Sequence, residues 1–482
     1  MNDFKGRTLR GGLAKLGAKA ADFVLRMGSL IVLARMLDPT DFGLVGMVTA
    51  ITGVLGLFKE FGLSLATVQR ESITEEQLST LFWINMLVGT VLGLVSAAIA
   101  PLVASFYNEP RLVEVMAALG LSFVFNAGGV QHSALLQRQM RFTALAVIEI
   151  LALVVGSAIS ILMALAGSGY WSLVAWSISL PLVATVLTWI WSGWIPGRPR
   201  FSNALGSLMR FGGIVTLNSL VVYIAYNLDK ILLGRFWGAQ VVGIYGRAYQ
   251  LVNLPTDYIN SATGSVAIPA LSRLQSEPER LRVYFLKGYS LVLSVTIPTT
   301  FACALFSTEL IHLLFGPKWS EAARIFLLLA PTIFVFALIN PAGWLLVALG
   351  LVGRSLRVAL VLAPVVIVGC VIGLPYGAAG VALGFSSAMI LWAIPHLLWC
   401  FHGTVVSFKD VMTVVGRPLL SGVVASVVAK VVLQLAGPFT SAFVTLLTGG
   451  TVLVGVYLLF LLFVMKQKDF YLSVFRSLRG SS

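Results

Sequence analysis

Charged side chains interrupt several of the long apolar runs in this sequence, and they are the residues best placed to do chemistry. In the hydrocarbon of a membrane each would cost about 2.5–3.5 kcal/mol or more at the centre of a helix, so it must face a partner or water. A cation held in this way can bind a phosphate by charge-assisted hydrogen bonds, and an acid can take up a proton. These charged residues are Asp22, Arg26, Lys59, Glu60, Glu149, Asp229, Lys230, Arg247 and Asp257.

The elements that carry these residues are predicted to be membrane helices. Of the 482 residues, 58% are hydrophobic and only 11% are charged, and the mean hydropathy is +0.94. A soluble protein would need a far more polar surface. The apolar runs are about 20 residues long and do not alternate, so they predict helices that satisfy their own backbone rather than strands of a barrel. We therefore expect an all-α integral membrane protein.

The apolar runs predict about fourteen transmembrane helices. Basic residues precede the first run, follow the last and recur in the even-numbered connections, which places both termini in the cytoplasm by the positive-inside rule. No connection exceeds roughly 20 residues, which leaves no room for a soluble catalytic domain. The predicted spans are 14–36, 41–64, 79–104, 112–136, 143–167, 169–191, 211–236, 243–268, 284–312, 322–349, 355–374, 377–401, 413–435 and 440–465.

A sixteen-residue motif occurs twice in the chain. Residues 31–46 and 231–246 share five identities at a constant offset of 200 residues, and in each copy an apolar run ends in Arg before Gly-x-x-Gly opens the next run. This pattern indicates a helix, a turn and a helix in each copy, and an internal duplication. Six crossings separate the copies, so the repeats are parallel. We expect two pseudo-symmetric six-helix lobes at 1–195 and 196–402, followed by two helices and a cytoplasmic tail at 403–482.

A duplicated membrane chain points first to a transporter whose substrate path lies between its repeats. Most of the charged residues fall on predicted helices one, two, seven and eight, so we expect these helices to line a water-filled cleft that is net basic. Such a cleft suits an anionic passenger, because a phosphate would replace the water that the cations give up. The candidate binding residues are Arg26, Lys59, Lys230 and Arg247.

Three of these four candidates also have a structural explanation. Asp22 and Arg26 stand four residues apart on one helix face and could simply neutralise each other. Lys59 and Arg247 lie nearer the ends of their predicted spans and could extend to the membrane surface.

Four acidic residues within the predicted spans are candidates for coupling transport to an ion gradient. A buried carboxyl group could take up a proton, although a satisfied packing role is an equal alternative for Glu149 and Asp257. The candidate coupling residues are Asp22, Glu60, Glu149 and Asp257.

No pattern in the sequence indicates catalysis, a cofactor or a metal. There is no pair of carboxylates on an outer loop, no Ser/His/Asp order and no glycine loop to hold a phosphate. Cys303, Cys370 and Cys400 fall inside apolar runs without the spacing of metal ligands. The net charge is +14, but the Lys and Arg residues are distributed as the positive-inside rule predicts and do not form one basic stripe. Nucleic acid is therefore not an expected partner. We expect a protein that is not an enzyme.

Four stretches of the sequence carry a family resemblance. They are residues 33–43 (LARMLDPTDFG), 69–83 (QRESITEEQLSTLFW), 134–142 (ALLQRQMRF), and 228–235 (LDKILLGR) through 248–255 (AYQLVNLP). Together they resemble the polysaccharide transporter family and, more narrowly, its colanic-acid exporter (Wzx-type) branch. This family lies within the multidrug/oligosaccharidyl-lipid/polysaccharide exporter superfamily.

The resemblance implies two lobes that alternate between inward- and outward-open states. It implies that the passenger is an undecaprenyl-diphosphate-linked oligosaccharide, an exopolysaccharide or O-antigen-type repeat unit, flipped across a bacterial inner membrane with an ion gradient as the driving force. Membrane lipids and polysaccharide polymerase or export machinery are the implied partners. Related flippases place basic residues on helices one, two, seven and eight, and the candidates here are the same four cations.

Two other functions remain as alternatives. A small-molecule or multidrug antiporter of the same superfamily would favour a cleft dominated by unpaired acids and aromatic residues. A membrane glycosyltransferase or polymerase would need longer outer loops than this sequence provides.

Overall fold

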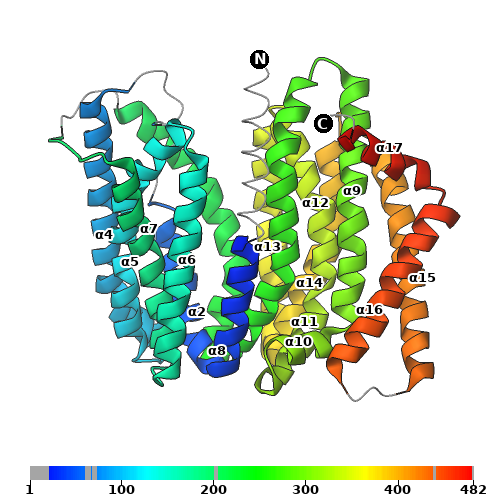
Figure 1. Ribbon diagram of the computed structural model, residues 1–482, viewed down its shortest axis with the longest axis horizontal. Coiled ribbons are helices and arrows are strands. Elements are labelled where there is room, and N and C mark those ends of the chain that lie inside the picture. Colours follow the sequence, from blue (N-terminus) through cyan, green and yellow to red (C-terminus); the bar gives the residue numbers. More distant parts are fainter. Residues whose placement is uncertain (1–20, 60–66, 68–72, 200–204, 438–440, 480–482) are drawn as a thin grey trace. The chain divides into compact units, whose positions relative to one another are not determined.

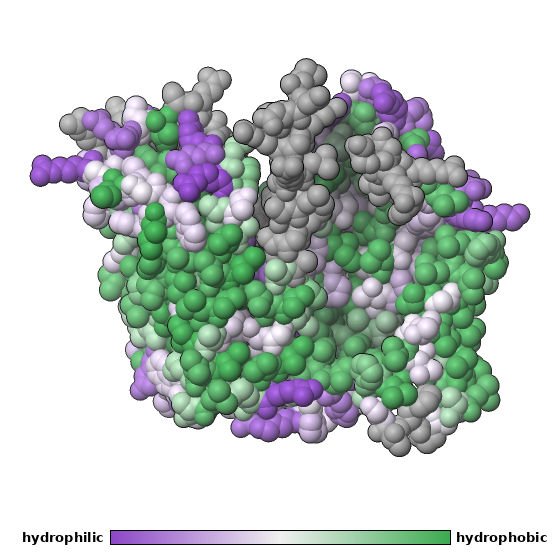
Figure 2. Space-filling view, viewed as in Figure 1, coloured by the Kyte–Doolittle hydropathy of each residue, from purple (hydrophilic) through white to green (hydrophobic). Residues whose placement is uncertain are grey.

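The protein is predominantly helical in the part of the chain that the structure describes. The computed structural model describes residues 21–59, 67, 73–199, 205–437 and 441–479, and no strand occurs among them (Figure 1). Ten helices in these ranges are long and apolar enough to cross a membrane. Figure 2 shows apolar residues over the middle of the visible face and hydrophilic residues along its upper and lower edges. The predicted all-α membrane class is therefore confirmed, while the count of fourteen crossings stays a prediction.

The chain forms two compact units, Met1–Gly243 and Ile244–Ser482. These two units are not the predicted lobes, whose boundaries are at residues 195 and 402. The division into two six-helix lobes and a C-terminal pair of helices stays a prediction. The helices of the first unit are residues 21–36, α2 (Pro39–Gly56), α4 (Glu75–Tyr107), α5 (Leu112–Arg138), α6 (Phe142–Leu165), α7 (Trp171–Ser192) and the first part of α8 (Leu205–Arg273).

Among the residues described in the second unit are the rest of α8 and nine further α-helices. A short 3-10 turn, Leu374–Tyr376, joins α13 to α14, and these two helices run side by side (Figure 1). The helices are α9 (Pro278–Leu305), α10 (Ser307–Leu314), α11 (Ser320–Leu329), α12 (Pro331–Ala348), α13 (Val352–Gly373), α14 (Gly377–Phe401), α15 (Phe408–Ala436), α16 (Ala442–Leu459) and α17 (Lys468–Arg479).

Local sequence signals begin and end several of these helices. Thr74 starts α4 with a capping box, in which its hydroxyl accepts from the backbone N–H of Gln77 and the Gln77 side chain accepts from the backbone N–H of Thr74, both at 3.2 Å. Pro39 stands in the first turn of α2, where its missing N–H costs nothing. Asn108 and Gly193 adopt the left-handed conformation that ends α4 and α7.

The duplicated motif folds in a similar way in both copies. In the first copy, the helix over residues 21–36 stops before Asp38, and α2 begins at Pro39. In the second copy, Gly238 interrupts α8 with a φ of 81° and a ψ of −179°. This positive φ favours glycine, and Gly238 is the counterpart of Asp38 at the offset of 200 residues. The predicted helix, turn and helix are confirmed in the first copy, and the second copy has a kink between two helical segments at the matching position.

The two copies also contact each other through the backbone next to their glycines. A Cβ atom added at Gly43 would overlap the carbonyl group of Ala239, and one added at Gly243 would overlap the carbonyl group of Pro39. Ala239 is the counterpart of Pro39 and Gly243 is the counterpart of Gly43, so the contact is reciprocal. Small residues let helix backbones approach closely inside a membrane. The start of α2 and the segment after Gly238 are therefore packed backbone to backbone.

Adding a methyl group to this contact should destabilise the protein. Gly43→Ala and Gly243→Ala are each expected to lower the free energy of unfolding by about 1–3 kcal/mol, because the methyl group must displace a backbone carbonyl. Gly246→Ala is the matched control, since its added Cβ has nothing within 4 Å. That control should be neutral or slightly stabilising. Thermal unfolding of the purified chain in detergent measures all three, and equal midpoints for Gly43→Ala and Gly246→Ala would contradict the close contact.

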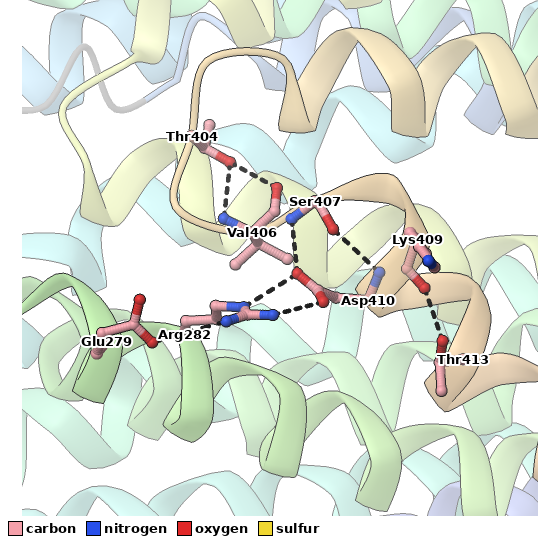
Figure 3. Close-up of polar contacts among 8 residues, drawn as sticks. All are labelled: Glu279, Arg282, Thr404, Val406, Ser407, Lys409, Asp410 and Thr413. Carbon is pink, nitrogen blue, oxygen red and sulfur yellow. Dashed lines mark hydrogen bonds and ion pairs between the residues drawn. The ribbon is translucent and has the colours of Figure 1, made fainter.

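An ion pair ties the start of α15 to α9 in the second unit (Figure 3). Arg282 donates from Nε and Nη2 to the two carboxylate oxygens of Asp410, at 3.0 and 2.6 Å. The same carboxylate accepts from the backbone N–H of Ser407 at 3.0 Å, and the Ser407 hydroxyl accepts from the backbone N–H of Asp410 at 3.1 Å. Glu279 approaches Arg282 only to 3.6 Å, with 86% of its side chain exposed. The bidentate pair with Asp410 is therefore the stronger of the two contacts of Arg282.

Loss of this bidentate pair should loosen the beginning of α15. Asp410→Asn is expected to cost about 1 kcal/mol, because the pair is partly exposed at the end of its helix. Hydrogen exchange at the first turns of α15 should become faster in this variant. Glu279→Gln removes the weaker neighbour of the same arginine and should leave exchange unchanged. If both variants exchange like the parent protein, the pair does not hold α15 to α9.

Candidate functional site

Asp22 and Arg26 form an ion pair on the helix over residues 21–36. Arg26 Nε donates to Asp22 Oδ1 at 2.9 Å, as their four-residue spacing predicts. The Asp22 side chain is 12% exposed, whereas the Arg26 side chain is 49% exposed. A guanidinium group has five N–H donors, so this bond leaves donors for an anion. The structural role that the spacing allowed is therefore present, and it does not prevent Arg26 from binding a ligand.

Lys230 is held by a neutral residue one helical turn before it. Its Nζ donates to Asn227 Oδ1 at 2.9 Å, and its backbone N–H donates to Asp229 Oδ1 at 2.7 Å. Asp229 is 1% exposed, while Lys230 is half-buried. Lys230 is therefore more exposed than the adjacent Asp229.

Lys59 follows α2 instead of lying inside a helix. The helix ends at Gly56, and the backbone N–H of Lys59 donates to the Gly56 carbonyl at 3.3 Å within a turn. The helix thus ends before Lys59, and the last residues of the predicted span over 41–64 lie outside the described residues. Glu60 lies outside the described residues. The binding role of Lys59 stays a prediction, now for a residue at a helix end.

The fourth basic candidate lies in the second unit, on the part of α8 that follows Gly238. Arg247 is half-buried and donates from Nη1 to Oε1 of Gln250. This neutral amide binds the guanidinium without cancelling its charge. The role of Arg247 in binding a passenger stays a prediction.

Two acidic candidates are exposed on long apolar helices. Glu149 lies on α6 between Val147 and Leu151, which are themselves exposed, and Asp257 is exposed on α8. A charge at the surface of a membrane helix must face water or a polar partner. Such positions suit acids that exchange protons or ions with water, although this coupling role stays a prediction. Within the described parts of the chain, no cluster of His, Cys, Asp and Glu side chains could hold a metal ion.

Two neutral amides accompany the cations, and a search for charges alone missed them. Asn227 and Gln250 each stand three residues from the cation that they bind. Polar residues three or four apart on one helix face are neighbours, so the spacing of each amide from its cation could have predicted these hydrogen bonds. The structure thus brings the candidates together in local groups on single helices. A common cleft that unites all four cations stays a prediction.

Comparison with known proteins places this chain among polysaccharide biosynthesis proteins. Residues 32–324 match the family described as polysaccharide biosynthesis protein. The chain is similar to the lipopolysaccharide biosynthesis protein WzxC of Escherichia coli, with 29% identity over 390 residues that cover 78% of each chain. It is also similar to the teichuronic acid biosynthesis protein TuaB of Bacillus subtilis, with 32% identity over 332 residues that cover 68% of each chain.

A solved structure shows the same fold. The lipid II flippase MurJ, in its inward closed conformation, aligns with a TM-score of 0.76 and 15% identity, over 96% of this chain and 100% of that one. The family match includes all four stretches that suggested the resemblance, and both copies of the duplicated motif except Ile31. This multi-pass membrane protein therefore belongs to the polysaccharide biosynthesis protein family.

Proposed function

We propose that this protein is a flippase that moves an undecaprenyl-diphosphate-linked oligosaccharide from the cytoplasmic to the outer leaflet of a bacterial inner membrane. Membership of a polysaccharide biosynthesis family supports a role in building a cell-surface glycan, as do relatives named for lipopolysaccharide and teichuronic acid biosynthesis. The likeness of its fold to that of a lipid II flippase supports transport of a glycan on a lipid carrier.

The half-exposed guanidinium of Arg26 carries this proposal. A cation exposed to hydrocarbon would cost about 2.5–3.5 kcal/mol or more, so its open side must meet water or a polar ligand. A diphosphate offers several oxygen acceptors to the donors that Asp22 leaves unused. Lys230 Nζ donates to Asn227 Oδ1, and its ammonium group is a second proposed binding group for the same kind of ligand.

In the proposed cycle, the cations bind the diphosphate while the saccharide crosses through water and the carrier's apolar tail stays in lipid. Arg26, Lys59, Lys230 and Arg247 line the cleft, and two lobes open it alternately to each side. Asp22 competes with the diphosphate for Arg26, so a proton or cation bound at Asp22 would release Arg26 for the passenger. Glu60, Glu149 and Asp257 are further proposed sites for ion coupling.

The proposed topology places both termini in the cytoplasm and delivers the passenger to the outer leaflet. Polymerase or export machinery would take up the glycan there. Reconstitution in liposomes with a labelled carrier-linked saccharide tests the function itself. Movement of the label to the opposite leaflet supports the flippase. New glycosidic bonds would favour an enzyme, and export of small cations without movement of the glycan would favour an antiporter.

Arg26→Gln is expected to reduce flipping at least tenfold, because a charge-assisted hydrogen bond contributes about 1.5–3 kcal/mol. The matched control is Arg280→Gln, which also removes an arginine from an ion pair, here with Glu277 at 2.6 Å. The control lies at the start of α9 and should flip at the parental rate. Initial rates in the same liposomes measure both variants. Parental flipping by Arg26→Gln would remove Arg26 from the mechanism.

Asp22→Asn separates the two possible roles of Arg26. If Arg26 serves only to neutralise Asp22, both Asp22→Asn and Arg26→Gln should fail in the same way. In the proposed mechanism, Asp22→Asn instead retains or strengthens binding of undecaprenyl diphosphate, because the guanidinium loses its competing acid. Arg26→Gln should weaken that binding at least tenfold. Equilibrium binding to the purified chain measures this difference, and equal losses in the two variants would support the purely structural pair.

A further inference from the structure

A groove of about 1050 Å³ runs along α13 and α14 in the second unit. Val368 and Ile372 line it from α13, and Leu383 and Leu391 line it from α14. Each of these four side chains is more than half exposed. Apolar side chains that are open in this way on membrane helices face lipid chains rather than water. The walls of the groove therefore suit a hydrocarbon chain.

The groove exists because α13 and α14 meet through glycines. Gly369 lies against the carbonyl of Gly384, and Gly373 lies against the carbonyl of Gly380. The missing side chains let the two backbones touch. All four glycines line the groove, so its floor is bare backbone between flanking apolar side chains.

One end of the groove carries a positive charge. Arg324 of α11 lines the groove and is exposed, and no hydrogen bond or ion pair joins its guanidinium to any other residue that the structure describes. The Ser386 hydroxyl of α14 donates to the carbonyl of Leu328 at 2.7 Å, which holds α11 beside α14. The chain runs along α11 and α12, back along α13 and forward along α14, so α11 and α14 begin at the same end.

Tyr376 marks this end as the boundary of the membrane. It lies in the turn between α13 and α14, lines the groove and is exposed. Tyrosine is enriched at membrane–water interfaces, and arginine there meets lipid headgroups. From Tyr376 to Pro364, the far lining residue of α13, the helix rises about 18 Å at 1.5 Å per residue. This length is close to the ~15 Å of hydrocarbon in one leaflet.

We propose that this groove binds one anionic phospholipid from the leaflet at that end. The lipid phosphate binds the guanidinium of Arg324, and one acyl chain lies along the glycine floor. A free phosphate would leave the apolar walls unused, and a zwitterionic lipid would gain less from the unpaired cation. The site does not include the cations of the proposed flipping mechanism, so lipid binding can be measured without transport.

Native mass spectrometry of the full chain in detergent tests the proposal by titration with phosphatidylglycerol and phosphatidylcholine. One molecule of phosphatidylglycerol should bind about fivefold more tightly than phosphatidylcholine, the effect of one basic residue on an anionic lipid. Arg324→Gln should remove this preference. Val368→Trp should weaken binding of both lipids, because the indole fills the groove. Thermal unfolding checks that each variant is folded.

Lys430→Gln is the matched control, because Lys430 is an exposed cation on α15 and does not line the groove. This variant should keep the preference for phosphatidylglycerol. A parental preference in Arg324→Gln, or an equal loss in Lys430→Gln, would overturn the proposal in favour of general attraction to a basic surface. Tighter binding of undecaprenyl phosphate, with displacement of phosphatidylglycerol, would also overturn it and assign the groove to the carrier's tail.

Discussion

The cost of placing a charge in hydrocarbon governs how this chain uses its few polar side chains. Three of the four candidate cations bind a polar neighbour one helical turn away, and only one of these neighbours is an acid. Each of these hydrogen bonds lowers the cost of carrying a cation on an apolar helix. The three groups are Asp22–Arg26, Asn227–Lys230 and Arg247–Gln250.

Helical class and the duplicated motif could be predicted from the sequence, because a backbone in lipid has few ways to satisfy its hydrogen bonds. The pairing of Asp22 with Arg26 followed from their spacing. The exposure of Glu149 and Asp257 could not be predicted, since the packed and lipid-facing sides of a membrane helix are both apolar and periodicity no longer marks the buried face. The end of α2 at Gly56 could not be predicted either, because the apolar run continues past that residue and hydropathy does not register where a helix ends.

Glycine shapes the two units in different ways. In the first unit, Gly43 and Gly243 are buried, and their contact brings backbones together and closes the space between them. In the second unit, Gly369 and Gly384 also bring backbones together, but large exposed side chains flank them. The same residue type therefore produces a closed contact in one place and an open groove in the other, and the neighbouring side chains decide which.

The reciprocal contact of Gly43 with Ala239 and of Gly243 with Pro39 has the symmetry of a two-fold dimer interface, in which each surface recognises its own copy. In a true dimer of identical chains, one mutation would change both halves of such an interface at once. Within a single duplicated polypeptide, it changes only one half. In one duplicated polypeptide, each half of the contact can therefore change on its own. Pro39 and its counterpart Ala239 are an example of two such positions that now carry different residues.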